Sequence, residues 1–71
     1  MKNLEWVKIE STNINSIAHR DSTLYVEFAG GTQYKYKLVP DSLYSDLLES
    51  DSKGKFLNEQ VKGSFEYENI V

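Results

Sequence analysis

Two alternating segments joined by a double glycine occupy the middle of the chain. Residues 24–28 alternate between apolar and polar or amphipathic side chains, and the alternation resumes at Tyr34-Lys35-Tyr36 and continues through Lys37. A period of two is typical of a half-buried strand, and Gly30-Gly31 between two such segments is a strong hairpin signal. The segment from residue 24 to residue 38 therefore predicts two antiparallel strands with one apolar face.

The apolar positions also predict a register for this hairpin. Three pairs are expected on the core face: Leu24 with Leu38, Val26 with Tyr36 and Phe28 with Tyr34. This register needs a loop of odd length, Gly30-Gly31-Thr32, with a glycine in the left-handed region. It places Glu27 opposite Lys35 on the outer face, where opposite charges help to fix register.

The segments before the hairpin are expected to be extended and joined by short bends. Residues 6–10 are expected to be extended, Ser11-Thr12-Asn13 to bend, and residues 14–19 to form the first main strand. Short polar side chains compete for backbone hydrogen bonds, which favours the bend, and Arg20-Asp21-Ser22 is turn-like for the same reason.

Two helices are expected after the hairpin. Pro40 suits the first turn of a helix, and residues 43–48 place apolar side chains on one helical face. Ser52 is expected to cap a second helix whose apolar face is formed by Phe56, Leu57 and Val61, and Gly63 to end it. Residues 64–68 alternate again and can add an edge strand.

This order predicts an α+β fold in one domain covering residues 1–71. The expected architecture is an antiparallel β-meander of three or four strands with two C-terminal helices packed on one face. The other face is then open to solvent. It is expected to carry Tyr25, Glu27, Lys35 and Lys37.

Composition narrows the class of protein. The chain has 71 residues, no cysteine and a net charge of −3, so neither a disulfide framework nor a thiolate metal site is available. No segment has the apolar length of a membrane span or a signal peptide, and a cytoplasmic protein is expected. The net charge argues against indiscriminate binding to phosphate backbones.

The lysines are unevenly distributed and suggest a local basic patch. Five of them are candidate nucleic-acid contacts: Lys35, Lys37, Lys53, Lys55 and Lys62. Outward lysines can meet phosphates, and the amides and lysines of residues 52–55 can hold an anion at a helix start. The alternative is that these are ordinary solvated lysines, that Ser52 caps the helix and that Gly54 permits close packing.

Tyr34 and Tyr36 can stack nucleobases, as strand aromatics do in sheets that bind RNA. The alternative, which the expected register favours, is that both pack in the core. Trp6 is expected at the edge of the core, with a partly exposed contact residue as the alternative. His19, the single histidine, is expected at the surface, because no second histidine or cysteine completes a metal site and no triad is indicated.

A set of segments in a fixed order resembles a known family. The segments are Ser11-Thr12-Asn13-Ile14 with Ile17, Leu24–Phe28 with Gly31, Tyr34-Lys35-Tyr36, Val39-Pro40, Tyr44 with Leu47-Leu48, and Ser52-Lys53-Gly54-Lys55-Phe56-Leu57-Asn58. Together they resemble the KTSC domain, a short module found alone in bacterial and phage proteins and at the C-terminus of some lysyl-tRNA synthetases. One departure is Ala18-His19-Arg20, where the family commonly has Gly-Tyr-Asp.

The resemblance implies a small binding module with no catalytic residues, no metal and no cofactor. It also implies association with RNA, because the module is attached to a synthetase. An alternative function is protein–protein interaction, or self-association as a homodimer through an exposed edge strand. The net charge of −3 favours this alternative over nucleic-acid binding.

Overall fold

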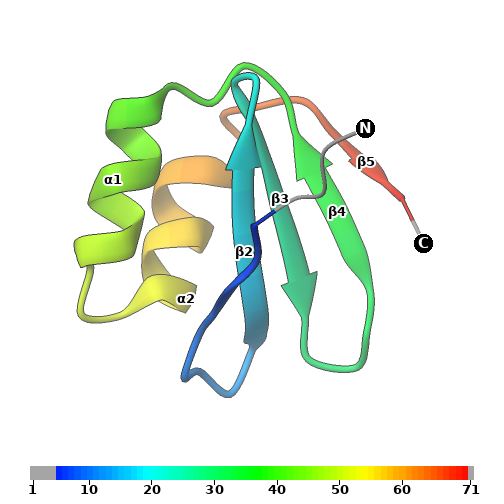
Figure 1. Cartoon of the computed structure of the whole chain (residues 1–71), viewed down its shortest axis with the longest axis vertical. Helices are drawn as coiled ribbons and strands as arrows, with labels where there is room; N and C mark the ends of the chain where they lie inside the picture. Colours follow the sequence, from blue (N-terminus) through cyan, green and yellow to red (C-terminus); the bar gives the residue numbers. More distant parts are fainter. Residues whose placement is uncertain (1–4, 71) are drawn as a thin grey trace.

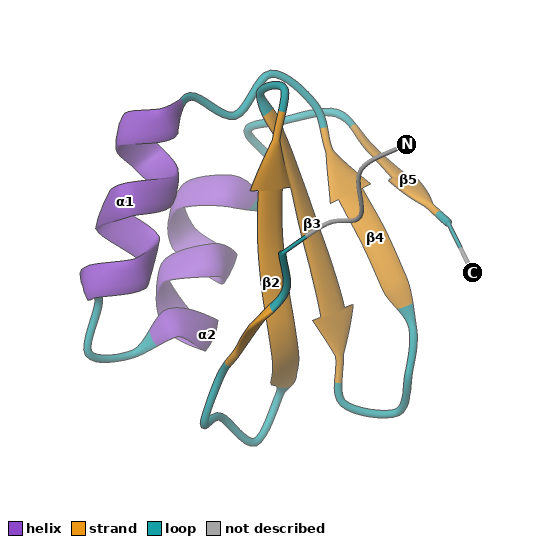
Figure 2. Cartoon of the chain, viewed as in Figure 1, coloured by secondary structure: helices purple, strands orange, loops and turns teal. Residues whose placement is uncertain are grey.

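The computed structural model describes residues 5–70 and has two layers, an antiparallel sheet and a helical layer packed on one of its faces (Figures 1 and 2). The sheet has five strands in chain order: β1 Val7–Lys8, β2 Ile14–Arg20, β3 Thr23–Phe28, β4 Gln33–Tyr36 and β5 Tyr67–Asn69. The helical layer contains α1 Asp41–Glu49, α2 Lys53–Phe56 and one π-helical segment, η1 Leu57–Val61, which continues α2.

The predicted α+β class and meander are confirmed, but the expected three or four strands become five. The two additional pairings lie at the edges of the sheet. Val7 and Lys8 pair with β2, and residues 67–69 pair with β4. The expected edge strand at residues 64–68 therefore exists, although it starts three residues later than predicted.

The β3–β4 hairpin has the predicted parity and a different register. Tyr36 lies opposite Leu24 and Tyr34 lies opposite Val26, so both tyrosines face the core side as expected. Each predicted partner on β4 lies two residues further along the chain than the partner in the structure. The amide of Phe28 donates to the carbonyl of Thr32 at 2.8 Å, so the loop is residues 29–31 instead of residues 30–32.

The loop glycines explain this register. Gly30 and Gly31 have φ angles of 99° and 95°, a conformation that side chains with a Cβ rarely adopt. The last residue of a three-residue hairpin loop takes the left-handed conformation, and a loop of residues 29–31 gives that position to Gly31, whereas the predicted loop of residues 30–32 gives it to Thr32. As a result Lys35 lies opposite Tyr25, and Glu27 lies opposite Gln33, so the predicted pair of Glu27 with Lys35 is wrong.

The end of β4 also differs from the prediction. Leu38 was expected to face the core opposite Leu24, but its φ is 60° and it is 80% exposed. The strand ends at Tyr36, and the chain turns so that Val39 takes the buried position with 0% exposure. The amide of Val39 donates to the carbonyl of Ser22 at 2.7 Å, which joins this turn to the β2–β3 hairpin.

The core lies between the sheet and the helices. Its buried members are Ile9, Ile14, Ile17, Leu24, Val26, Tyr36, Val39, Leu47, Leu57 and Val61. The helices contribute Leu47 from α1 and Leu57 and Val61 from η1, so the predicted apolar faces are correct except at Leu48, which is 37% exposed. Burial of these side chains is the main source of stability in so small a fold.

The helix boundaries agree with the sequence prediction, but the cap of the second helix differs. α1 follows Pro40, and Gly63, with a φ of 84°, lies just after η1. Ser52 occupies the N-cap position without a hydrogen bond from its side chain to the helix. The hydroxyl of Ser50 instead accepts the amide of Ser52 at 3.2 Å, so the local polar contacts fix the turn before the helix.

The side chain of His19 is mostly buried, and its predicted surface position is wrong. Its side chain is 7% exposed and stacks on Tyr44 with 4.8 Å between ring centroids. Nε2 donates to the carbonyl of Val39 at 2.7 Å, because a carbonyl can only accept, and Nδ1 lies 3.4 Å from Asp41. His19 therefore connects β2 to the junction between β4 and α1.

Replacing His19 is expected to destabilise the fold. His19→Ala removes a stacked ring and leaves the Val39 carbonyl without this donor, and we expect a loss of about 2–4 kcal/mol in unfolding free energy. His19→Phe retains a ring but lacks the donor, so its loss should be smaller. Urea denaturation measures both, and an alanine variant as stable as the parent would contradict the assigned role.

Tyr36 is expected to make stability depend on alkaline pH. Burial, with smaller contributions from Tyr34 and Tyr67, raises the pKa of Tyr36 from 10.0 to about 12. The unfolded chain then ionises first, so stability falls as pH rises from about 10 towards 12 and is unaffected below. Urea denaturation across this interval should show a smaller loss for Tyr36→Phe than for the parent, and equal losses would contradict the expectation.

Candidate nucleic-acid interface

The face of the sheet opposite the helices carries rows of side chains that run across the strands. Residues paired directly across antiparallel strands share a face. One row contains Lys8, Ser16, Glu27 and Gln33, which follow one another across β1 to β4. The next row contains Ala18, Tyr25, Lys35 and Glu68 across β2 to β5. We call this surface the outer face.

An aromatic pair lies on the outer face. Tyr25 is half-buried on the central strand, and the ring of Trp6 meets it edge to face, with 6.4 Å between centroids and 65° between planes. Trp6 is 38% exposed and does not belong to the core cluster. The expected position of Trp6 at the core edge is therefore wrong, and its partly exposed alternative is what the structure has.

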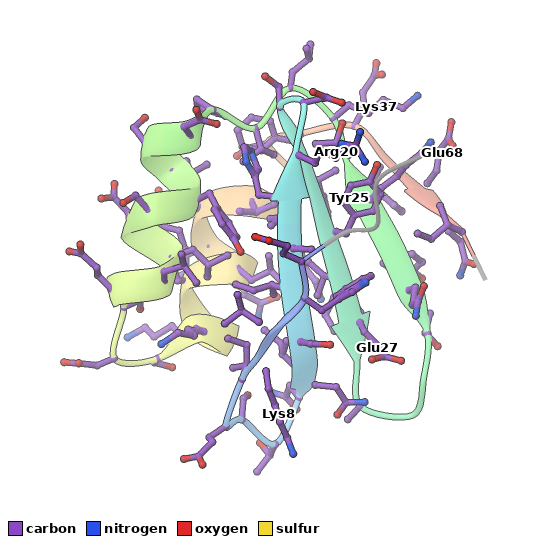
Figure 3. All side chains as sticks on the ribbon, viewed as in Figure 1. Lys8, Arg20, Tyr25, Glu27, Lys37 and Glu68 are labelled. Atoms are coloured by element: carbon purple, nitrogen blue, oxygen red, sulfur yellow. The ribbon has the colours of Figure 1, made fainter. Side chains whose placement is uncertain are left out.

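Cations surround this aromatic pair. Figure 3 shows Lys8 near one end of the sheet, Arg20 and Lys37 near the other, and Tyr25 between them. Lys35 lies beside Tyr25 on the neighbouring strand. The acids near these four cations are Glu27, Glu68 and Asp21, whose carboxylate is 3.6 Å from Arg20. The four cations and these three acids together carry a charge of +1, whereas the whole chain carries a net charge of −3.

Glu68 neutralises part of this charge. Its two carboxylate oxygens lie 3.1 Å from the ammonium of Lys37 and 3.5 Å from that of Lys35. The hydrogen bond and the charge of Lys37, together with the charge of Lys35, lower the pKa of Glu68 below its ordinary value. The outer face thus already holds one anionic group between two of the lysines predicted to contact nucleic acid.

The other three predicted lysines lie elsewhere. Lys53 donates to the carbonyl of Ser50 at 2.9 Å, and Lys55 is exposed on the same short helix. The ammonium of Lys62 lies 5.0 Å from the ring centre of Phe28, a residue that packs against the core on the helical side. The structure therefore divides the five predicted lysines between the outer face and the helical side.

A polar hollow separates the bend at residues 11–13 from the start of α2. It encloses about 450 Å³ and is lined by Glu10, Ser11, Thr12, Asn13, Asp51, Ser52, Lys53, Gly54, Lys55 and Asn58. A Cβ on Gly54 would lie 3.7 Å from the Ser11 hydroxyl and the Asn13 amide, which is an ordinary contact distance. Close packing therefore does not require this glycine, contrary to the sequence interpretation.

No metal centre is built around these surfaces within residues 5–70. The described part of the chain has no group of three or more histidine, cysteine, aspartate or glutamate side chains placed to hold a metal ion. Its helices are also too short or too polar for a bilayer span.

Comparison with known proteins identifies the family. The model of the KTSC domain matches residues 10–65 of the chain. The chain belongs to the KTSC domain family. A solved KTSC domain protein from Yersinia pestis has the same fold, with a TM-score of 0.89 and 28% sequence identity over 97% of this chain and 100% of that one. The predicted resemblance is therefore confirmed.

Two kinds of relative share this KTSC segment. A lysine–tRNA ligase from Nostoc punctiforme is 38% identical over 55 residues, which cover 78% of this chain and 10% of the ligase. An uncharacterised protein from Stutzerimonas stutzeri is 34% identical over 58 residues, covering 79% of this chain and 82% of that protein. The same domain thus occurs as a small part of a ligase and as most of a short protein.

The matched range covers the whole polar hollow and only part of the outer face. The two serine-containing segments that carry the resemblance, residues 11–14 and 52–58, line opposite sides of the polar hollow. In contrast Trp6, Lys8 and Glu68 lie outside residues 10–65. Sequence reasoning missed Lys8 and Arg20, although Lys8 alternates with Val7 and Ile9, and Arg20 has the same parity as Ala18.

Proposed function

We propose that this KTSC domain is a non-catalytic cytoplasmic module that binds single-stranded nucleic acid, with RNA preferred, through its outer face. The observation that carries the proposal is the aromatic pair of Trp6 and Tyr25 among four cations on a sheet face that no helix of residues 5–70 covers. Sheets that bind single strands combine these parts, since aromatic rings stack on bases and cations meet phosphates.

The relatives support RNA as the ligand. The lysine–tRNA ligase of Nostoc punctiforme is named for a tRNA substrate, and the segment it shares with this chain covers 10% of its length. The environment of His19 supports a non-catalytic role, because both ring nitrogens face groups of the fold.

A second candidate is self-association through β5. This strand is at the edge of the sheet, all three of its residues are exposed, and an edge strand offers unpaired backbone groups to another chain. Sedimentation at rising protein concentration tests this candidate, and a monomer at the highest concentration would exclude it.

The proposal predicts salt-dependent binding of single strands. Titration of labelled single-stranded RNA, single-stranded DNA and duplex RNA should show tightest binding to single-stranded RNA and weaker binding as salt rises. Tyr25→Ala should weaken binding about 5- to 100-fold, the range expected for loss of base stacking. Lys8→Gln should make the salt dependence of binding shallower, by about the amount expected for the loss of one phosphate contact.

Lys55→Gln is the matched control, because it removes a lysine from the helical side and leaves the outer face unchanged. It should bind as the parent does. Absence of binding at low salt, or equal losses for Lys8→Gln and Lys55→Gln, would overturn the assignment to the outer face.

The proposal also predicts that Glu68 competes with phosphate. Glu68→Gln removes the charge that lies 3.1 Å from Lys37 and 3.5 Å from Lys35, so both lysines become available to a phosphate. We expect affinity for single strands to rise several-fold at low salt and the salt dependence to become steeper. The control is Glu49→Gln, which removes an exposed glutamate from α1, away from the outer face. Unchanged affinity for Glu68→Gln would contradict the prediction.

A further inference from the structure

A second hollow lies on the helical side of the sheet, beside the edge strand. It encloses about 380 Å³ and is lined by Tyr34, Tyr36, Lys62, Gly63 and Tyr67. We call it the tyrosine hollow. The helical layer ends at Val61, and the chain then passes Gly63 on its way to β5, so none of the described helices covers β4 and β5 at this point. Its volume lies within the range of small-ligand sites, which is about 300–1,000 Å³.

Three aromatic rings form one wall of the tyrosine hollow. Tyr67 lies 5.5 Å from Tyr34 and 5.9 Å from Tyr36, measured between ring centroids. Tyr36 is 2% exposed and supports the cluster from the core, whereas Tyr67 is 61% exposed. The cluster therefore presents one accessible ring whose position is fixed by the rings behind it. Such a ring is suited to stacking against a planar ligand.

A cation lies at the edge of the same hollow. The ammonium of Lys62 is 5.0 Å from the ring centre of Phe28, and among the described residues no carboxylate forms an ion pair with it. Lys35 and Lys37 differ in this respect, because both contact Glu68. Lys62 therefore keeps a positive charge that a phosphate can meet without displacing a protein group.

The tyrosine hollow adjoins the outer face. A neighbouring hollow of about 540 Å³ shares Gly63 and Tyr67 with it and is also lined by Lys37. Lys37 belongs to the cations around the aromatic pair of the outer face. The neighbouring hollow also includes Glu66 and Glu68, which disfavour phosphate, so phosphates are expected at Lys37 and Lys62 and not between them.

We propose that the tyrosine hollow is a nucleotide subsite, in which a base stacks on Tyr67 and its phosphate pairs with Lys62. The occupant is a terminal nucleotide of a strand that crosses the outer face and passes around β5 at Lys37, and this continuation rests on the proposed function. A free nucleotide has the same chemistry and is the other possible source.

Two ligand series distinguish these sources. One uses uridine and adenosine monophosphate alone, and the other uses single-stranded RNA from a dinucleotide to a decanucleotide, each followed by amide chemical shifts and by affinity. We expect the shortest RNAs to affect the outer face only. Longer RNAs should gain affinity and shift the amides of Lys62, Gly63 and Tyr67.

The variants Tyr67→Leu and Lys62→Gln test the subsite. Tyr67→Leu should abolish the gain in affinity with RNA length, which is a loss of about 5- to 100-fold in affinity for the longer RNAs. Lys62→Gln should reduce the gain several-fold, whereas Tyr67→Phe, which retains the ring, and Lys55→Gln should retain it. Tyr67 and Lys62 are exposed, so we expect these variants to fold, and urea denaturation checks that they do.

The outcomes separate the two proposals. If Tyr25→Ala weakens binding and Tyr67→Leu leaves the longer RNAs unaffected, the subsite is wrong and the proposed function stands. If monophosphates bind and perturb Tyr67 while RNA does not bind the outer face, the hollow is a site for free nucleotides and the proposed function is wrong. If neither ligand series binds, both proposals are wrong.

Discussion

The alternation of side chains in the β3–β4 hairpin is the constraint on which the rest of the structure depends. Leu24 and Tyr36 meet on one face of this hairpin, and Tyr25 and Lys35 meet on the other. A slip of one residue would exchange the two faces and place charged side chains beneath the helices. The parity therefore fixes both the surface that receives the helices and the surface that remains for binding.

Much of the fold follows from local sequence signals. The bend at residues 11–13, the helix start after Pro40 and the turn at Gly63 each depend on residue types that favour one backbone conformation. The register of the hairpin required more than the apolar pattern, because registers two residues apart place the same side chains inward. The left-handed last position of the loop decided between them, because it falls on Gly31 in the observed register and on Thr32 in the predicted one.

The candidate site was less predictable than the fold. His19 has the parity of Ile17 and could have been assigned to the core side, but its bond to Val39 depends on the turn after β4. Whether Lys62 shares a surface with Lys35 depends on the angle at which η1 packs on the sheet. A single sequence does not give this packing angle. Predicting the contact between Trp6 and Tyr25 required the pairing of β1 with β2, and β1 is only two residues long.

The acids of this chain are divided between the helical layer and the outer face. Asp46, Glu49 and Asp51 lie on α1 and the following turn, away from the outer face. Asp21, Glu27 and Glu68 lie among the cations of the outer face, and Glu68 contacts two of its lysines. The net charge of the whole chain therefore does not indicate how the outer face meets a phosphate. The placement of one carboxylate, Glu68 on β5, determines how much of the positive charge of Lys35 and Lys37 is available.

The order of strands in the sheet has a kinetic consequence. Each neighbouring pair from β1 to β4 joins segments that are adjacent in the chain, so these pairings close short loops and are expected to form early in folding. The pairing of β4 with β5 spans the whole helical layer and closes a far longer loop. We therefore expect β5 to dock last and to open first in native-state hydrogen exchange. Because β5 carries both Glu68 and Tyr67, its opening would release Lys35 and Lys37 and dismantle the tyrosine hollow in one event.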